Sequence, residues 1–355
     1  IELEEDLFLG LLQPWNSLNQ TYEPATIHFD NGYVQETLTN VGFKQKGSGC
    51  RKHQKHCWNV KFDAFEEDQK FEGMKKLGIK GGTNDDDVLA KYMLYVDMMR
   101  AVVDFMASRI EDDDGEGNLM KFDGGVYLQY LGDDVEIYQN NSNYEQAEGD
   151  GDWTDFVDFL YFLNATSDEE FEEQLEDRVD VDGLLRLMII ESFLMDTDGM
   201  TRNGRNYNTY HLRDDKHKDK WQLFNYDFDM SLEFNINTHN PYMGERYLNI
   251  FTFFQRELGE DEYNPLTNRL LAIPQYNETY QNMYAAFLEA VFGSESMKQP
   301  TVLHGERMQF VLPWMEKDQI WQLSNGLNSS QFIAYCEYTI DLLTERYRNV
   351  TLQLQ

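Results

Sequence analysis

The chain has 355 residues, of which 41% are hydrophobic and 14% aromatic, enough to fill the cores of two lobes or domains. Its formal net charge is −34 at pH 7, and so acidic a surface repels nucleic acid and anionic lipid. No apolar run reaches the roughly 18 residues of a membrane span, so no membrane insertion is expected. The partners that this charge favours are proteins, above all basic ones, and divalent cations.

The first part of the chain is typical of β-structure. Three segments have the composition and alternation of strands, at 25–29, 34–46 and 56–62. A glycine-containing turn, KGSGC, lies between the last two. A helix is predicted next, over 85–106, because apolar residues recur at helical spacing after an N-capping run of aspartates.

Helical patterns dominate the rest of the chain. They cover 156–166, 168–179, 180–195, 264–292, 307–318 and 330–350. The segment 180–195 is almost wholly apolar, so we expect a buried helix that carries a polar loop at its C-terminal end. No Ser/Gly-rich tract separates the parts, which argues against a flexible linker between independent domains.

The polar loop and the strand-like segment after it, KWQLFNYDFDM, are the most informative stretch. Its acidic and amide residues are Asp196, Asp198, Asn206, Asn208, Asp227 and Asp229. ATP-dependent phosphoryl transfer needs an Asp that orients the acceptor hydroxyl, and an Asn and a second Asp that hold Mg²⁺ against the phosphates. Asp and Asn also cap helices and turn loops, so each residue alone has a purely structural explanation. The combination favours a phosphotransferase site.

This stretch resembles the signature of the CotH kinase family of atypical kinases, which has the form D…NYYLYRD…GKW.FIPWDFD. Asp198 takes the place of the first Asp, and NTYHLRD from Asn208 that of the Asn strand. KWQLFNYDFD from Lys220 takes the place of the last part, with Tyr226 instead of the usual Trp. Further matches extend from about Thr37 to the C-terminus, so the resemblance covers most of the chain.

The resemblance implies a single domain with a mixed α+β, kinase-like fold of two lobes. A small β-rich lobe would cover about 1–110 and a larger α-helical lobe about 111–355. The family also implies ATP, Mg²⁺ (or Mn²⁺), and phosphorylation of Ser or Thr in secreted or surface proteins. Asp198 would then be the catalytic residue that orients or deprotonates the acceptor hydroxyl. The metal ligands would be Asn208, Asp227 and Asp229.

A phosphate-binding role follows from the same resemblance in the N-terminal part. The family has a K/R-G-N-S-S loop before a strand KKSYKIKF, and here the loop contains Gly47 and Ser48 while Lys55 and Lys61 match the first and last strand lysines. A glycine turn lets backbone N–H groups approach phosphates, and a strand lysine neutralises them. Taken alone, one such turn is more typical of an ordinary hairpin.

Six N-x-[S/T] sequons give a compartment signal, and they exceed what chance gives in a chain of this composition. They are Asn19, Asn140, Asn164, Asn277, Asn328 and Asn349. We therefore expect a glycosylated protein that is secreted or at the cell surface. The acidic N-terminal residues, IELEEDLF, lack the basic region of a signal peptide, so any such peptide has been removed or was never present.

The three cysteines fit the same compartment. Cys50 and Cys57 flank the polar connection RKHQKH, and we expect them to form a disulfide that staples a hairpin. A second pair of ligands at zinc-site spacing is missing. Cys336 lies in an apolar helical segment and is expected to be a buried free thiol.

Two departures from the family pattern leave alternatives open. The family has a β-hairpin after the helix that ends near Arg100, and here MMRAV joins VDFMASRI directly. That helix also lacks the Glu that pairs with a strand lysine in kinases. An active secreted kinase is favoured by the intact Asp and Asn set. A catalytically silent surface protein in adhesion or extracellular assembly is favoured by the two departures, and an unrelated calcium-binding surface protein is the third possibility.

Overall fold

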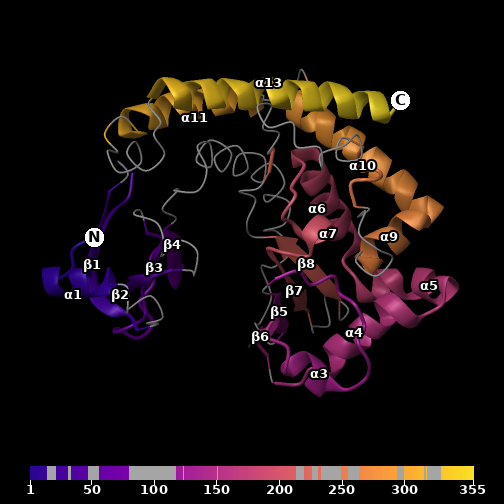
Figure 1. The fold of residues 1–355 in the computed structure, drawn as a ribbon, viewed down its shortest axis with the longest axis horizontal. Helices are drawn as coiled ribbons and strands as arrows, with labels where there is room; N and C mark the ends of the chain where they lie inside the picture. Colours follow the sequence, from indigo (N-terminus) through magenta and orange to yellow (C-terminus); the bar gives the residue numbers. More distant parts are fainter. Residues whose placement is uncertain are drawn as a thin grey trace. The chain divides into compact units, whose positions relative to one another are not determined.

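The computed structural model describes residues 1–13, 21–30, 33–46, 56–79, 117–122, 124–149, 151–212, 220–225, 231–232, 249–254, 264–293, 300–315, 317 and 329–355. The chain divides into two compact units (Figure 1). Unit 1 comprises Ile1–Leu89 and Phe310–Tyr335, and unit 2 comprises Ala90–Gln309 and Cys336–Gln355. Two antiparallel four-stranded sheets combine with helices, so the predicted mixed α+β class is confirmed.

Unit 1 holds a meander of antiparallel strands in the order β1-β2-β3-β4. Their bounds are Glu23–Asp30, Gln35–Gln45, Trp58–Lys61 and Lys76–Ile79. The first three confirm the predicted strands, whereas β4 was not predicted because its four residues, KLGI, are largely exposed and show no apolar face. Helix α1, Glu5–Leu11, packs on the sheet through Phe8, whose ring stacks on Trp58 at 5.8 Å between centroids.

Unit 2 is built on a sheet of order β6-β5-β7-β8. The bounds are Asn118–Phe122 for β5, Tyr144–Glu148 for β6, Tyr207–His211 for β7 and Trp221–Asn225 for β8, and the short helix α3, Val135–Gln139, precedes β6. Strand β8 confirms the N-terminal half of the predicted strand 220–230, and the other half lies outside the described residues. Successive side chains alternate between the faces of a strand. In β7, Tyr207 and Thr209 therefore lie on one face and Asn208 on the other.

The predicted helices are present with changed ends. They are α4 Thr154–Ala165, α5 Asp168–Arg178, α6 Val181–Leu194, α9 Pro265–Ala272, α10 Pro274–Phe292, α11 Pro300–Met315 and α13 Ser329–Gln353. The stretch 264–292 is two helices because Pro274 cannot continue α9 and instead begins α10. The prediction of a helix over 85–106 lies outside the described residues.

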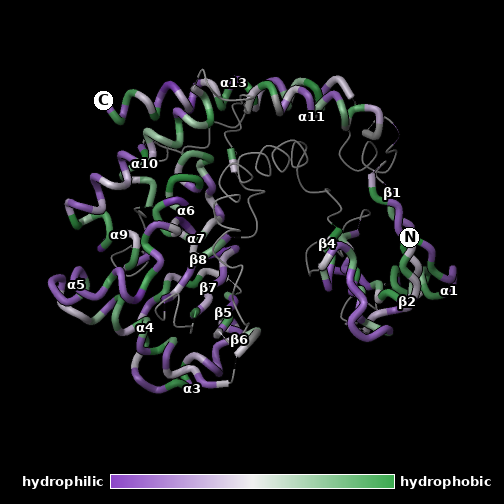
Figure 2. Tube along the Cα trace, turned by 180° about the vertical axis from the view of Figure 1, so that it is seen from behind, coloured by the Kyte–Doolittle hydropathy of each residue, from purple (hydrophilic) through white to green (hydrophobic). Residues whose placement is uncertain are grey.

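Helix α6 forms the centre of unit 2. All its residues are buried except Asp182 and Arg186, and it packs against β8 and α10. Burying an aliphatic or aromatic side chain contributes about 1.5–3 kcal/mol, so this helix contributes strongly to unit 2's hydrophobic core. Figure 2 shows that α6 is largely hydrophobic, whereas α5, with the sequence DEEFEEQLEDR, is mainly hydrophilic. A fixed α6 in turn fixes the loop at its C-terminal end.

Candidate functional site

Asp198 lies on the loop between α6 and the short helix α7, Met200–Asn203. Helix α6 ends because Met195 adopts the left-handed conformation, at φ 52° and ψ 44°. The chain then folds back, with the Asp196 N–H donating to the Glu191 carbonyl at 2.9 Å. The Asp196 Oδ1 atom accepts from the Asp198 N–H at 3.2 Å. This is the predicted arrangement of a buried helix that presents the Asp loop.

The Asp198 carboxylate is held in one orientation by donors from the following turn. Asn206 donates through Nδ2 to Oδ2 at 3.1 Å and to the Asp198 carbonyl at 3.0 Å. Asn203 Nδ2 lies 3.4 Å from Oδ1, and Arg205 Nη1 lies 3.5 Å from the same oxygen. The Asp198 side chain remains 24% exposed. The carboxylate is thus oriented and still accessible, as is required of a group that accepts a proton from an incoming hydroxyl.

Two glycines allow the loop to close so tightly. A Cβ on Gly199 would lie 2.6 Å from Asp196 Oδ2 and 2.7 Å from Glu191 Oε1. Gly204 has φ +60°, and a Cβ there would lie 2.3 Å from the Val126 carbonyl oxygen. Gly204 therefore excludes a side chain, and at Gly199 a side chain would displace the Asp196 and Glu191 carboxylates.

Asn208 follows the loop on β7, where it pairs in register with Phe224 of β8 and Lys121 of β5. Its side chain is 9% exposed, and its Oδ1 atom has no hydrogen-bond partner among the described residues. A buried amide oxygen without a partner is costly, and a bound cation or water would satisfy it. Amide and carboxylate oxygens are the ligands that Mg²⁺ prefers, so this atom fits the predicted metal-binding role.

Glu191 is a functional candidate that the sequence did not reveal. Its carboxylate is fully buried in the last turns of α6, beneath the Asp198 loop. It accepts the backbone N–H groups of Met200 and Thr201, each at 2.9 Å, and contacts Thr201 Oγ1 and Asn225 Nδ2. Burial raises the pKa of the Glu191 carboxyl, while the hydrogen bonds that it accepts act in the opposite direction. The only signal in the sequence is one acidic residue inside the apolar run LMIIESFLM.

A second buried charge, that of Arg346, lies at the same end of α6. Its Nη2 donates to the Ser192 carbonyl at 2.6 Å and its Nε to the Phe193 carbonyl at 3.1 Å. Burial lowers the pKa of this guanidinium, and Tyr284 and Tyr280 partly offset the effect. Arg346 comes from α13 and so fixes the C-terminal carbonyls of the helix that carries the Asp198 loop.

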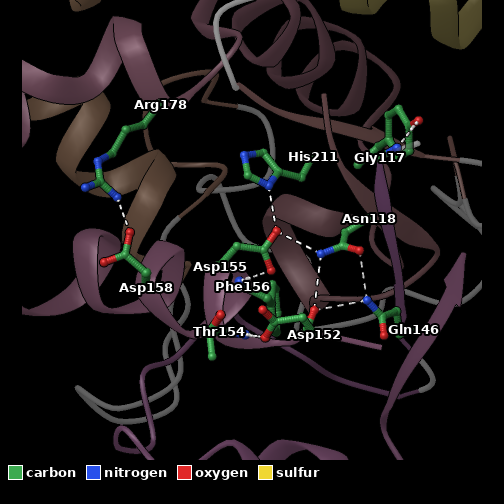
Figure 3. Close-up of polar contacts among 11 residues, drawn as sticks. Gly117, Asn118, Gln146, Asp152, Thr154, Asp155, Phe156, Asp158, Arg178 and His211 are labelled. Atoms are coloured by element: carbon green, nitrogen blue, oxygen red, sulfur yellow. Dashed lines mark hydrogen bonds and ion pairs between the residues drawn. The ribbon is translucent and has the colours of Figure 1, made fainter. Parts of the chain in front are cut away.

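A separate polar network lies at the other end of β7 (Figure 3). His211 Nδ1 lies 2.6 Å from Asp155 Oδ2, and Asn118 Nδ2 donates to the same oxygen at 2.8 Å. Gln146 donates to Asn118 Oδ1 at 2.9 Å, and the His211 ring stacks on Trp221 at 4.4 Å between centroids. The hydrogen bonds join β5, β6 and β7 to Asp155 at the start of α4, and the ring contact adds β8. Their role is therefore to hold the sheet and the helix together.

Several predicted site residues cannot be placed. Gly47, Ser48, Lys55, Asp227, Asp229, Cys50, Asn19 and Asn328 all lie outside the described residues. Lys61 lies on β3 of unit 1, 3.6 Å from Asp63, whereas Asp198 and Asn208 belong to unit 2. Asp198 therefore lies on the loop between α6 and α7, and Asn208 lies on β7 of the same unit. The roles of Lys61, Asp227 and Asp229 stay predictions. Within the described ranges, no group of three or more His, Cys, Asp and Glu side chains is placed to hold a metal ion.

The described sequon asparagines differ in their surroundings. Asn140 is exposed at the end of α3, whereas Asn164 donates to the carbonyls of Leu160 and Leu128 at 2.7 and 2.9 Å. Asn277 and Asn349 are partly buried and accept hydrogen bonds from glutamines one turn later.

The cysteines and the helices add two observations. Cys57 is disulfide-bonded, and the predicted partner Cys50 lies outside the described residues. Cys336 is buried and free, as predicted. In the part of the chain that the structure describes, no helix is both long and apolar enough to span a bilayer.

Comparison with known protein families identifies the family of the chain. No curated protein matches the chain. The family described as CotH kinase protein matches residues 94–350, a span that contains the Asp198 loop, β5 to β8 and helices α4 to α10. Strands β1 to β4, including Lys61, precede the matched residues. The match covers most of the chain, and the protein therefore belongs to the CotH kinase protein family.

Proposed function

We propose that this protein is an atypical protein kinase that transfers the γ-phosphate of ATP to Ser or Thr of a protein substrate. The proposal rests on two residues, Asp198 and Asn208. An oriented, accessible carboxylate, Asp198, lies ten residues before Asn208, whose buried amide oxygen has no hydrogen-bond partner among the residues that the structure describes. Family membership supports the general use of ATP and a divalent metal. The proposed architecture is a two-lobed kinase fold, with a β-rich lobe of about 1–110 and a helical lobe of about 111–355.

Asp198 is the residue that would act on the acceptor. Because Asn206, Asn203 and Arg205 all donate to its oxygens, the carboxylate points in a set direction. A substrate hydroxyl that donates to the exposed part of this carboxylate is aligned for attack and can pass its proton to it. Positioning of this kind supplies much of the barrier reduction in phosphoryl transfer, where little covalent chemistry is left to the protein.

Asn208 would hold the metal through Oδ1, together with Asp227 and Asp229 from the segment after β8. A bound Mg²⁺ or Mn²⁺ neutralises charge on the phosphates of ATP. Gly47, Ser48, Lys55 and Lys61 would hold the phosphates from the β-rich part. The chain's own contribution is thus to fix the acceptor hydroxyl through Asp198 and to keep the metal ligands ordered.

The second candidate is a catalytically silent member of the family that acts in adhesion or extracellular assembly. One observation favours it: the Arg205 guanidinium already forms an ion pair with Asp198 at 3.5 Å. The guanidinium occupies a carboxylate oxygen that the acceptor hydroxyl would otherwise approach. The Arg205 side chain is half exposed, so the pair is readily displaced by substrate and does not decide between the candidates.

For location we propose the secretory pathway, with the protein secreted or at the cell surface. The support is the set of six sequons and the disulfide-bonded Cys57, since disulfides persist in oxidising compartments. The net charge of −34 favours a basic protein as substrate or assembly partner, and disfavours nucleic acid and membrane insertion.

The test compares wild type with Asp198→Asn in transfer of ³²P from ATP to a basic, Ser-rich protein. Asn keeps the size of the side chain but cannot take a proton, so kcat should fall by about 10²-fold or more while ATP binding persists. Asp177→Asn, at an exposed position of α5, is the matched control and should keep wild-type activity. Absence of transfer by wild type, together with no Mg²⁺·ATP effect on its melting temperature, would favour the silent alternative.

A further inference from the structure

The buried carboxylate of Glu191 connects the Asp198 loop to the strand that leads to Asp227. Glu191 is completely buried, seven residues before Asp198 in the chain. Charged side chains are rarely buried unless they are paired or hydrogen-bonded, because removing a carboxylate from water is unfavourable. The unfavourable burial of the Glu191 carboxylate therefore indicates a specific role for this residue.

The hydrogen bonds of Glu191 identify that role. Oε2 accepts the backbone N–H of Thr201 at 2.9 Å and contacts its hydroxyl, and Oε1 accepts the backbone N–H of Met200 at 2.9 Å. These donors belong to α7, the turn immediately after Asp198. Oε1 also contacts Asn225 Nδ2, at the end of β8 and two residues before Asp227. One side chain thus joins the end of α6, the turn after Asp198 and the end of β8.

The packing around this carboxylate leaves little freedom. The backbone of Gly199 passes so close that an added Cβ would lie 2.7 Å from Glu191 Oε1. Each carboxylate oxygen of Glu191 receives two donor contacts, so the four contacts fill the roughly four acceptor sites of a carboxylate. A neutral amide of the same shape would turn an N–H₂ group toward donors, and a shorter acid would not reach both partners.

We propose that Glu191 is a positioning residue for phosphoryl transfer, which holds the Asp198 loop and the start of the Asp227 segment in register. This inference rests on the proposed kinase function. It assigns to Glu191 no contact with substrate, since its hydrogen bonds go to Met200, Thr201 and Asn225. The reaction therefore depends on Glu191 through the geometry of the Asp198 loop and of Asn225 at the end of β8.

The experiment compares Glu191→Gln with Glu173→Gln, an exposed glutamate of α5, in two independent measurements. The first is hydrogen exchange of peptides that cover 195–205, which requires no activity. In Glu191→Gln the amides of Met200 and Thr201 should exchange about tenfold faster, because their acceptor is weakened. The control should exchange as wild type does.

The second measurement is kcat and KM for ³²P transfer, well below the melting temperature of each variant. A displacement of about 1 Å at a positioning group costs about 10²-fold, so kcat should fall by that order with a smaller change in KM for ATP. A residue that only stabilised the fold would leave the kcat of folded protein unchanged. Should Glu191→Gln fail to fold, Thr201→Val and Asn225→Ala remove one donor each and should loosen only 199–204 and 221–225, respectively.

The outcomes separate the two ideas. Unchanged exchange in 195–205, or faster exchange with wild-type kcat, overturns the inference about Glu191. Faster exchange in a protein whose wild type transfers no phosphate refutes the kinase function and with it the catalytic part of the inference, while the structural link between Glu191 and the loop stands. Faster exchange with a reduced kcat supports both.

Discussion

Arg346 offers a direct test of how the C-terminal end of α6 is held. Arg346→Met removes the guanidinium but keeps an unbranched apolar side chain, so the change leaves a smaller gap than alanine would. The residue is 2% exposed and donates to the carbonyls of Ser192 and Phe193. The variant therefore leaves two carbonyls in the core without these donors.

The magnitude follows from those two hydrogen bonds. A hydrogen bond from a charged donor contributes about 1.5–3 kcal/mol, so two give about 3–6 kcal/mol. Methionine avoids the desolvation of a buried cation, which offsets part of this loss. We expect a net decrease of about 3 kcal/mol in the free energy of unfolding. For a unit of some 150–250 residues this corresponds to a melting temperature lower by about 6–12 °C.

The assay is urea and thermal unfolding followed by circular dichroism and tryptophan fluorescence, with coincident transitions required. Arg348→Met is the matched control, since Arg348 is exposed on the same helix two residues later, and its effect should stay within about 0.5 kcal/mol. A cost below about 1 kcal/mol for Arg346→Met would refute the reasoning. It would mean that the Ser192 and Phe193 carbonyls find other donors.

Three further outcomes are expected. Arg269→Lys should lower the free energy of unfolding by about 2 kcal/mol in urea, because a lysine cannot reproduce the planar guanidinium that donates to the carbonyls of Leu163, Thr166 and Ser167. In a glycosylating host, glycopeptide mass spectrometry should find Asn140 occupied and Asn164 unmodified, because the Asn164 amide already donates to two carbonyls. Cys336 should react with a maleimide only after denaturation, and a fast reaction in the native protein would contradict its burial.

The parts of the fold that were predictable are those whose signal is local. The strands at β1 to β3 and helices α4, α5 and α6 each show their own periodicity, and the burial of α6 follows from its apolar run. The strands β5 and β6 were not predicted. They are five residues long, β5 pairs with β7 about 90 residues later, and β6 pairs with β5. Short strands acquire their stability from such partners rather than from their own sequence.

The same division applies to the candidate site. Asp198 and Asn208 were predicted as site residues because Asp and Asn occur in an ordered pattern after an apolar helix. The residues around them were not predicted, because Glu191 hydrogen-bonds to Thr201, ten residues later, and contacts Asn225 at the end of β8. Only the folded chain shows that a glutamate within an apolar run is satisfied by groups so distant in sequence.

Two opposite charges are therefore buried at one end of one helix, and each serves a different set of groups. The Arg346 guanidinium takes the last carbonyls of α6, while the Glu191 carboxylate takes the N–H groups of the turn that follows Asp198. Helix dipoles favour a cation at a C-terminus and disfavour an anion there, so Glu191 is placed against the field of its own helix. That placement costs free energy, whereas a hydrophobic residue at the same position would avoid this cost. The hydrogen bonds of Glu191 in turn fix the geometry of the Asp198 loop. Substitution of Glu191 by an apolar residue should then leave α6 intact and release the loop, which separates the stability of the helix from the order of the site.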